Sequence, residues 1–144
     1  KIATVKNSVS KYKDSKVTAN ASYRYTVRAY YQASGKTYTS KYTTGPVIKA
    51  APALQQVSSV KSEKNGIRVR WSTQKKCDGY YIYRKKKGGS YQLIKKISNR
   101  NTATYLDKKA QKGVSYYYAV KAYVKEPYGN TYSKYKSSSV IKRK

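Results

Sequence analysis

The sequence of 144 residues predicts an all-β fold, an antiparallel sandwich of short strands. Several segments alternate apolar and polar residues with a period of two, and no segment shows apolar residues at helical spacing. Glycine-containing turn signals separate these segments at short intervals. A tyrosine-rich segment near the start also recurs later in the chain. These observations together predict a complete sandwich at residues 51–144, preceded at residues 1–50 by the later strands of another.

The recurrence defines a repeated unit. The string YRYTVRAY at residues 23–30 returns as YYYAVKAY at residues 116–123, an offset of 93 residues. The same offset aligns Asp14 with Asp107. Self-similarity at a fixed offset is typical of a structural unit that the chain builds more than once. Residues 1–50 are therefore interpreted as the C-terminal part of one unit and residues 51–144 as a complete second unit.

Each strand is predicted from its own alternation. In the first unit, the segment 23–30 places Tyr23, Tyr25, Val27 and Ala29 on one face. In the second unit, strands are expected at residues 66–71, 80–84, 91–97, 102–106 and 116–123. Turn signals fall between these segments, at Asn65-Gly66, Asp78-Gly79, Gly88-Gly89, Lys112-Gly113 and Gly129-Asn130.

Two further expectations concern the core and the connection between the units. Trp71 ends its strand at inward parity, so we expect it to pack against Tyr80, Ile82 and Tyr118. Residues 45–54 carry two prolines and no glycine-serine tract, which predicts a semi-rigid linker that joins the units end to end.

The chain has 19 tyrosines, one tryptophan and no phenylalanine. Tyrosine must therefore supply aromatic side chains both to the core and to the surface. Tyrosines at inward or corner positions are expected in the core: Tyr12, Tyr23, Tyr25, Tyr80, Tyr105, Tyr116 and Tyr118. Others have outward parity or fall in loops: Tyr30, Tyr31, Tyr81, Tyr83, Tyr117, Tyr123 and Tyr128. The outward set could form a recognition surface, or it could only stabilise an exposed sheet by cross-strand contacts.

Composition limits the chemistry. The chain has 33 basic and 5 acidic residues, one cysteine, and no histidine or methionine. A single Cys77 excludes an internal disulfide, and the absence of histidine argues against transition-metal sites and cysteine or serine nucleophiles paired with histidine. No apolar run approaches the roughly 18 residues of a membrane helix, and the first residues lack the pattern of a signal peptide. We expect neither a metal nor a cofactor.

Carboxylate pairs are the remaining catalytic possibility, and only five carboxylates exist: Asp14, Glu63, Asp78, Asp107 and Glu126. Asp14 and Asp107 occupy equivalent positions just after a strand, where capping of a turn explains both. The other three fall in separate predicted loops. The protein is therefore not expected to be an enzyme.

The second unit resembles a fibronectin type III module. The resemblance is carried by the proline-led first strand APALQQVSSV, the strand that ends in Trp71, the segment GYYIYR, and the form Tyr-x-Tyr-x-Val-x-Ala at residues 116–122. It implies an immunoglobulin-like sandwich with a tyrosine corner at Tyr116 and, in the first unit, at Tyr23. The sequence of these segments is similar to that of tandem modules in secreted or surface proteins of Gram-positive, Clostridia-like bacteria. An extracellular or cell-surface location follows from that resemblance.

By the same resemblance, residues 1–50 align only with the later strands of a module and have no counterpart of Trp71. We expect the inward faces of Val5, Tyr23, Tyr25 and Val27 to be exposed, together with unpaired strand edges. The missing strands could come from a second copy through self-association, from an upstream segment, or from a swapped arrangement.

Three functions are compatible with these features. The favoured one is a non-catalytic extracellular binding or spacer module that attaches to an anionic envelope polymer, such as teichoic acid, or to acidic host glycans, because the net charge is +28. The candidate polyanion-binding residues are Arg84, Lys85, Lys86, Lys87, Lys95 and Lys96. The alternative is recognition of a host protein, such as an immunoglobulin, through Tyr123, Lys125, Tyr128 and Asn130. Nucleic-acid binding is the third, suggested by interleaved basic and aromatic residues.

Overall fold

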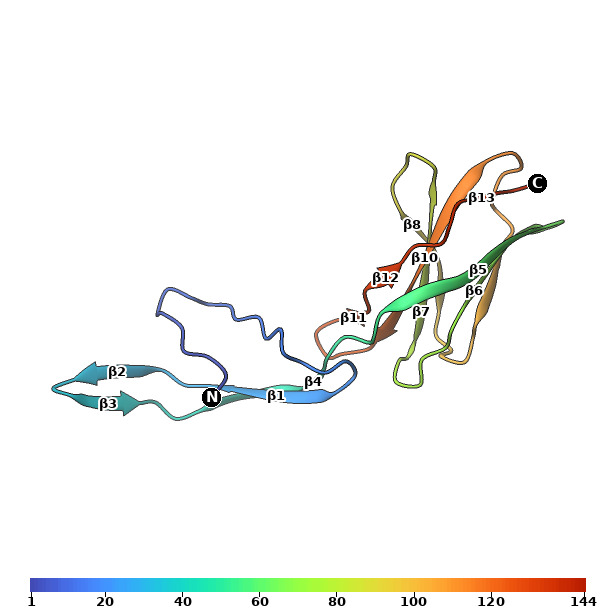
Figure 1. Ribbon diagram of the computed structural model, residues 1–144. Coiled ribbons are helices and arrows are strands. Elements are labelled where there is room, and N and C mark those ends of the chain that lie inside the picture. The colour runs from blue at the N-terminus through green and yellow to red at the C-terminus, as the bar shows by residue number, and fades with distance from the viewer.

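The computed structural model describes residues 1–144 and confirms the all-β prediction, since every regular element is a strand. Residues 1–50 extend away from a two-layered sandwich that contains the rest of the chain (Figure 1). The hairpin of β2 (Tyr30–Ala33) and β3 (Lys36–Thr39) lies at the far end of this extension. The molecule contains no helix with the length and hydropathy needed to cross a membrane.

The sandwich consists of two sheets. The first contains, in order, β12 (Tyr135–Lys136), β5 (Gln55–Glu63), β6 (Gly66–Trp71) and β9 (Thr104–Asp107). The second contains β11 (Thr131–Tyr132), β10 (Ser115–Val124), β7 (Gly79–Lys86) and β8 (Gln92–Ile97), with β13 (Ile141–Lys142) also paired to β10. All pairs are antiparallel except β12 with β5. This arrangement is an immunoglobulin-like sandwich of the fibronectin type III kind.

The core lies between these sheets and follows the predicted alternation. Ile67, Val69 and Trp71 of β6 are all buried, and the Trp71 ring lies 5.4 Å from the ring of Tyr80, centroid to centroid. Ile82 and Tyr118 belong to the same apolar cluster. The prediction for Trp71 is therefore confirmed, and the only tryptophan reports directly on this core.

The first unit has two separate ribbons. One pairs β1 (Ser22–Val27) with β4 (Thr43–Lys49), and the other pairs β2 (Tyr30–Ala33) with β3 (Lys36–Thr39). None of residues 1–50 is buried, and Val27 is 71% exposed. The expected exposure is confirmed for Val5 and Val27, whereas Tyr23 and Tyr25 are partly buried. Tyr12, which was expected in the core, is exposed.

Two predicted boundaries are wrong in this unit. The single strand 23–30 is divided, because the β1 ladder ends where Val27 pairs with Thr43 and Tyr30 begins the β2–β3 hairpin. The predicted linker 45–54 is shorter, because β4 continues through Lys49. The register of β1 and β4 shifts between Arg24 and Thr26. This irregularity accommodates Pro46, which has no N–H to give to the ladder.

The connection between the units is held by hydrogen bonds on both sides. The backbone N–H of Asn20 donates to the carbonyl of Ala51 at 3.3 Å, and the N–H of Lys49 donates to Glu126 Oε1 at 3.1 Å. Glu126 lies in the loop between β10 and β11. These two hydrogen bonds connect the first unit with the second across the predicted domain boundary between residues 50 and 51. The position of that boundary stays a prediction.

Candidate functional site

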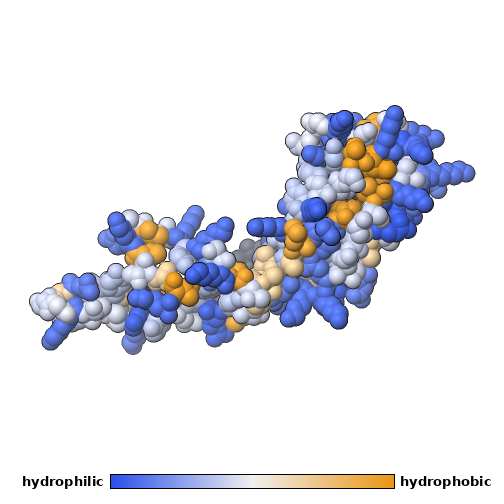
Figure 2. Space-filling view, in the orientation of Figure 1, coloured by the Kyte–Doolittle hydropathy of each residue, from blue (hydrophilic) through white to orange (hydrophobic).

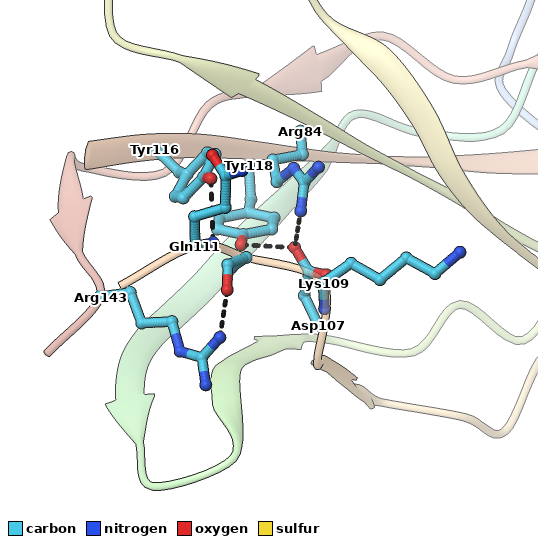
Figure 3. A network of polar contacts seen from close by, with 8 residues as sticks. Arg84, Asp107, Lys109, Gln111, Tyr116, Tyr118 and Arg143 are labelled. Carbon is cyan, nitrogen blue, oxygen red and sulfur yellow. Dashed lines mark hydrogen bonds and ion pairs between the residues drawn. The ribbon is translucent and has the colours of Figure 1, made fainter. Parts of the chain in front are cut away.

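A buried polar network lies at one end of the sandwich, around the carboxylate of Asp107 at the end of β9 (Figure 3). Asp107 is 1% exposed, and its Oδ2 accepts hydrogen bonds from Arg84 Nη1 and from the Tyr118 hydroxyl, both at 2.8 Å. Its Oδ1 accepts from the N–H of Lys109 at 3.1 Å. The carboxylate caps the turn after β9, as its position in the repeat predicts, and it also balances a cation.

The neighbouring Tyr116 makes the expected corner. Its hydroxyl accepts a hydrogen bond from the N–H of Gln111 at 3.1 Å, which ties the start of β10 to the preceding loop (Figure 3). Burial, followed by the hydrogen bond to Asp107, raises the pKa of Tyr118 well above its usual range. Both tyrosines are buried and structural, while the Arg84 side chain of this network is 22% exposed.

This network corrects one predicted site residue. Arg84 was expected among the polyanion-binding cations, but its guanidinium is paired with Asp107 and lies 4.9 Å from the ring centroid of Tyr116. The reason is parity, because Arg84 follows the buried Tyr80 and Ile82 at the same alternation along β7. Arg84 points into the sandwich, whereas Tyr83 and Lys85 lie on the opposite face.

That opposite, outer face of the second sheet carries alternating rings and ammonium groups. Lys85 Nζ lies 5.0 Å from the ring centroid of Tyr91 and 5.1 Å from that of Tyr117. Lys96 Nζ lies 5.1 Å from the ring of Tyr81, and Lys121 Nζ lies 5.2 Å from Tyr83 and 5.3 Å from Tyr135. We call this surface the tyrosine–lysine face: Tyr81, Tyr83, Tyr91, Tyr117, Tyr132, Tyr135, Lys85, Lys96 and Lys121.

Edge-to-face ring contacts hold the tyrosines of this face together. The ring centroids of Tyr81 and Tyr132 are 5.1 Å apart, and those of Tyr91 and Tyr135 are 5.7 Å apart. The Tyr91 hydroxyl donates to Ser137 Oγ at 2.7 Å. A hydrogen bond with Tyr132 lowers the pKa of Tyr81 and raises that of Tyr132, while partial burial raises the pKa of Tyr83. The rings thus form a connected and partly desolvated surface.

Tyr123 is a second correction. The alternation predicts an exposed side chain and a role in protein binding, but Tyr123 is only 5% exposed. Its partner across the sheet is Gly79, and a Cβ on that glycine would come within 2.9 Å of the Tyr123 ring and 1.9 Å of the Ile97 carbonyl oxygen. The glycine leaves room for the ring to lie flat on the sheet, and the Tyr81 ring packs against it at 5.0 Å.

The other candidates for protein binding lie in the β10–β11 loop. Tyr128 is 84% exposed, and Lys125 and Asn130 are exposed as well. Asn130 Nδ2 donates to the Tyr81 hydroxyl at 3.2 Å, so this loop borders the tyrosine–lysine face. The backbone N–H of Lys125 donates to Asp78 Oδ2 at 2.8 Å, which fixes the start of the loop.

The remaining basic candidates lie at two places, the β7–β8 hairpin and strand β8. Lys86 and Lys87 are exposed at the β7–β8 hairpin, where Gly88 has a φ of 82° that a side chain would strain. Lys95 and Lys96 are exposed on β8, but a register irregularity precedes them and only Lys96 has a ring beneath its ammonium group. The structure brings Lys85 and Lys96 onto one face and adds Lys121, which sequence reasoning missed although its outward parity in YYYAVKAY could have indicated it.

Cationic groups are also widespread outside this face. Hydrophilic residues cover most of the visible surface of both units, and apolar residues gather only in a few patches (Figure 2). A pocket near the junction of the units is lined by four cations and one carboxylate, together with three neutral residues: Lys49, Lys75, Lys76, Arg100, Asp78, Asn20, Cys77 and Val124. The net charge gives the whole surface a positive potential. The tyrosine–lysine face has five lysine–ring contacts, whereas the first unit has one cation over a ring, Arg28 over Tyr42 at 4.8 Å.

Each carboxylate has a structural partner. Glu63 forms an ion pair with Arg68 at 3.0 Å, and the carboxylates of Asp78 and Glu126 accept backbone hydrogen bonds. No group of three histidine, cysteine, aspartate or glutamate side chains is placed to hold a metal ion. The buried thiol of Cys77 donates to the carbonyl of Gln74 at 3.3 Å.

Comparison with known proteins finds similar solved structures only. No family model and no curated protein matches the chain. The FN1–FN3 domains of chicken CNTN1 align with 92% of this chain and 46% of their own, at 22% identity and a TM-score of 0.49. A β-1,2-glucanase from Parabacteroides distasonis aligns with 76% of this chain and 16% of its own, at 21% identity and a TM-score of 0.46.

A two-domain fibronectin type III segment of chicken tenascin aligns with 83% of this chain and 64% of its own, at 18% identity and a TM-score of 0.44. The chain thus spans less than two thirds of each of these structures. The strand order and register described above define the sandwich independently of these similarities.

Proposed function

We propose that this chain is a non-catalytic binding and spacer module of a secreted or surface protein of a Gram-positive bacterium, and that it attaches to an anionic polymer of the cell envelope or to acidic host glycans. The observation that supports this function is the tyrosine–lysine face, where three ammonium groups are held over tyrosine rings on an open sheet. The fibronectin type III-like fold is compatible with such a role but is used by modules of many functions.

The face suits a polymer in which anionic groups alternate with sugars. An ammonium group held over a ring loses less side-chain entropy when it binds an anion, because its position is already restricted. The partly exposed rings of Tyr83 and Tyr117 offer flat apolar area to the C–H surface of a sugar. Charge brings the polymer to the chain, and the spacing of rings and cations decides where it binds.

A spacer role is supported by the first unit. Residues 1–50 form extended ribbons rather than a second compact body, and they are attached to the sandwich through the short segment between Lys49 and Gln55 (Figure 1). Hydrogen bonds from Asn20 and Lys49 restrict this junction. The sandwich is thereby held away from the far end of the ribbon.

The experiment measures binding of the full chain to purified teichoic acid and to heparin over a series of salt concentrations. We expect affinity to fall steeply with salt, as counterion release requires. The triple variant Lys85→Ser, Lys96→Ser, Lys121→Ser should lose at least roughly tenfold more affinity than Lys61→Ser, Lys108→Ser, Lys112→Ser, since cations with ordered surroundings contribute more than diffuse ones. Both variants have the same net charge, and the control lysines are exposed outside the face.

A third variant tests the rings themselves. Tyr117→Leu keeps apolar bulk but removes the aromatic ring near Lys85. We expect weaker binding with an unchanged salt slope, because no charge is lost. If the two triple lysine variants bind the polymers with equal affinity and Tyr117→Leu binds normally, charge acts only diffusely and the proposed site is wrong.

Recognition of a host protein, such as an immunoglobulin, is the second candidate, and the exposure of Tyr128 favours it. An aromatic side chain that protrudes from a loop is typical of a protein-binding contact. Under this alternative, Tyr128→Ala abolishes a salt-tolerant interaction with the host protein, while the lysine triple changes little. A single-stranded oligonucleotide in the same salt series tests nucleic-acid binding.

A further inference from the structure

Hydrogen bonds fix the backbone of the pocket at the junction of the two units. The pocket is lined by the β6–β7 loop, the β8–β9 loop, the end of β10 and two residues of the first unit. The buried Tyr80 hydroxyl accepts from the N–H of Gln74 at 2.7 Å and donates to the carbonyl of Arg100 at 3.0 Å, so one side chain holds both loops. The N–H of Asp78 donates to the carbonyl of Tyr123 at 2.8 Å, which ties the β6–β7 loop to β10. The shape of the pocket is therefore determined by the sandwich itself.

Four cationic side chains surround this pocket, and none of them has a partner within the chain. Neither ion pair of the structure includes any of the four. Two of them form hydrogen bonds through backbone atoms, but none of the four charged groups donates one. On the tyrosine–lysine face, by contrast, each ammonium group lies over a ring. The four residues are Lys49 of the first unit and Lys75, Lys76 and Arg100 of the second.

The carboxylates near the junction do not balance these charges. Asp78 is the only one that lines the pocket, and its Oδ2 accepts from the N–H of Lys125 at 2.8 Å. Glu126 accepts from the backbone N–H of Lys49 but does not line the pocket, and Asp14 accepts two hydrogen bonds from residues of its own unit. The lining residues have four positive charges and one negative charge, a net charge of +3. Like charges held close together repel, so an anion among them is favoured.

Asn20 adds an uncharged donor on the side of the first unit. It lies in the turn before β1, where the predicted tyrosine corner is confirmed, since the Tyr23 hydroxyl accepts from the N–H of Thr18 at 2.8 Å. The Oδ1 of Asn20 is buried, and its side-chain amide forms no hydrogen bond within the chain, so Nδ2 is available to a ligand. The pocket has a volume of about 340 Å³. Since a water in the liquid occupies about 30 Å³, a small anion fits together with several waters.

We propose that this pocket binds a tetrahedral oxyanion, a phosphate or sulfate group, between the cation of the first unit and the three cations of the second. The guanidinium of Arg100 presents parallel N–H donors to two oxygens of such an anion, and the lysine ammonium groups turn toward the others. A carboxylate has only two oxygens and cannot use all four cations in this way. The bound anion links the two units, in addition to the hydrogen bonds that Asn20 and Lys49 make across the junction.

Binding at this pocket is expected to be weak and dependent on salt, because all four cationic residues are exposed. The pocket is open to solvent, so the oxyanion is either a free ion or an ester group of a larger molecule. None of the lining residues belongs to the tyrosine–lysine face. The proposal therefore stands or fails independently of that face.

The test titrates the full chain, labelled with nitrogen-15, with inorganic phosphate while sodium chloride keeps the ionic strength constant. We expect saturable chemical-shift changes at the amides of residues 49, 75–78 and 100, with a dissociation constant of roughly 1 mM. Inorganic sulfate, which has the same shape, should change the same amides. Glycerol phosphate that binds as tightly as inorganic phosphate indicates an ester of a larger molecule as the ligand, and much weaker binding indicates the free ion. Both results support an oxyanion site.

Matched variants distinguish the pocket from diffuse charge. Lys75→Gln together with Lys76→Gln should weaken phosphate binding roughly tenfold or more, because two charged donors to the anion are lost. The control, Lys108→Gln together with Lys109→Gln, removes two adjacent exposed lysines from the turn after β9 and should bind phosphate nearly as the unchanged chain does. Lys49→Gln should weaken binding several-fold, since the first unit then supplies no cation.

A conservative variant tests the guanidinium. Arg100→Lys keeps the charge but removes the planar pair of donors, so we expect several-fold weaker binding. The proposal is wrong if the shift changes do not saturate, or if they spread over exposed lysines outside the pocket. It is also wrong if sulfate leaves the amides of residues 75–78 unchanged, or if the control pair weakens binding as much as the pocket pair. Normal phosphate binding by Lys49→Gln would contradict an anion held between the units.

Discussion

Replacement of Arg84 by glutamine tests the assignment of this residue to the core network rather than to the polyanion-binding surface. The side chain of Arg84 is 22% exposed and that of Asp107 is 1% exposed, so the substitution leaves a buried carboxylate with two neutral donors, the Tyr118 hydroxyl and the Lys109 N–H. Removal of one partner of a buried ion pair costs about 3–5 kcal/mol. Partial exposure of Arg84 favours the lower end of this range.

The expected loss is a large part of the total free energy of unfolding. A domain of this size has an unfolding free energy of roughly 5–15 kcal/mol. With a urea dependence of about 1–3 kcal/mol per molar, a loss of about 3 kcal/mol lowers the midpoint of unfolding by roughly 1–3 M. Trp71 is the only tryptophan and lies in this core, so its fluorescence follows the transition of the second unit without a probe.

The neighbouring residue provides the control. Lys85→Gln removes the same charge from the outer face, where it loses only the contacts with the rings of Tyr91 and Tyr117, each worth roughly 0.5–1 kcal/mol at an exposed site. The double variant Arg84→Gln, Asp107→Asn should be more stable than Arg84→Gln alone, because it no longer contains an unpaired buried charge. Equal urea midpoints for Arg84→Gln and Lys85→Gln would refute the reasoning. A double variant that is less stable than Arg84→Gln alone would refute it as well.

Three further predictions concern the same sandwich. Trp71→Ala should destabilise it by about 3–5 kcal/mol through a core cavity, and an unchanged melting temperature would contradict the assigned strand register. Gly79→Ala should lower the melting temperature, because its Cβ would meet the Ile97 carbonyl oxygen at 1.9 Å; Gly89→Ala, whose closest contact is 3.5 Å, is the control that should melt normally. Burial raises the pKa of Tyr80 to about 12, so the stability that its neutral hydroxyl contributes is present below pH 10 and is lost as the pH rises from 10 to 12. Tyr80→Phe should therefore show a shallower fall in unfolding free energy over that interval, and parallel curves for the two proteins would show that Tyr80 does not titrate as expected.

The sequence was most informative where a local pattern alone determines the structure. The alternation in GIRVRW predicted the bounds of β6 and its three inward residues. The resemblance to a fibronectin type III module predicted both tyrosine corners. These features depend on local pattern and on a core that any sandwich must fill. They could be read without knowledge of the neighbouring strands.

The candidate site was less predictable, because its residues are brought together across strands. Arg84 was grouped with the adjacent lysines as a run of charge, although its parity matched that of the buried Ile82. Tyr123 is buried because Gly79 lies opposite, and this pairing is a matter of register rather than of local sequence. The lysine–ring contacts of Lys96 and Lys121 require the same knowledge.

The registers of the two units also determine how each would respond to tension. Ser22 pairs with Lys49, so the chain enters and leaves the β1–β4 ribbon at the same end, and a pull on these points opens one rung at a time. In the sandwich, Gln55 pairs with Tyr135 in a parallel sense, while Lys144 donates to Ser62 near the other end of β5. A pull between Gln55 and Lys144 loads many hydrogen bonds in shear at once. Stretching a single molecule should therefore extend the ribbon at low force, while the sandwich resists until a much higher one.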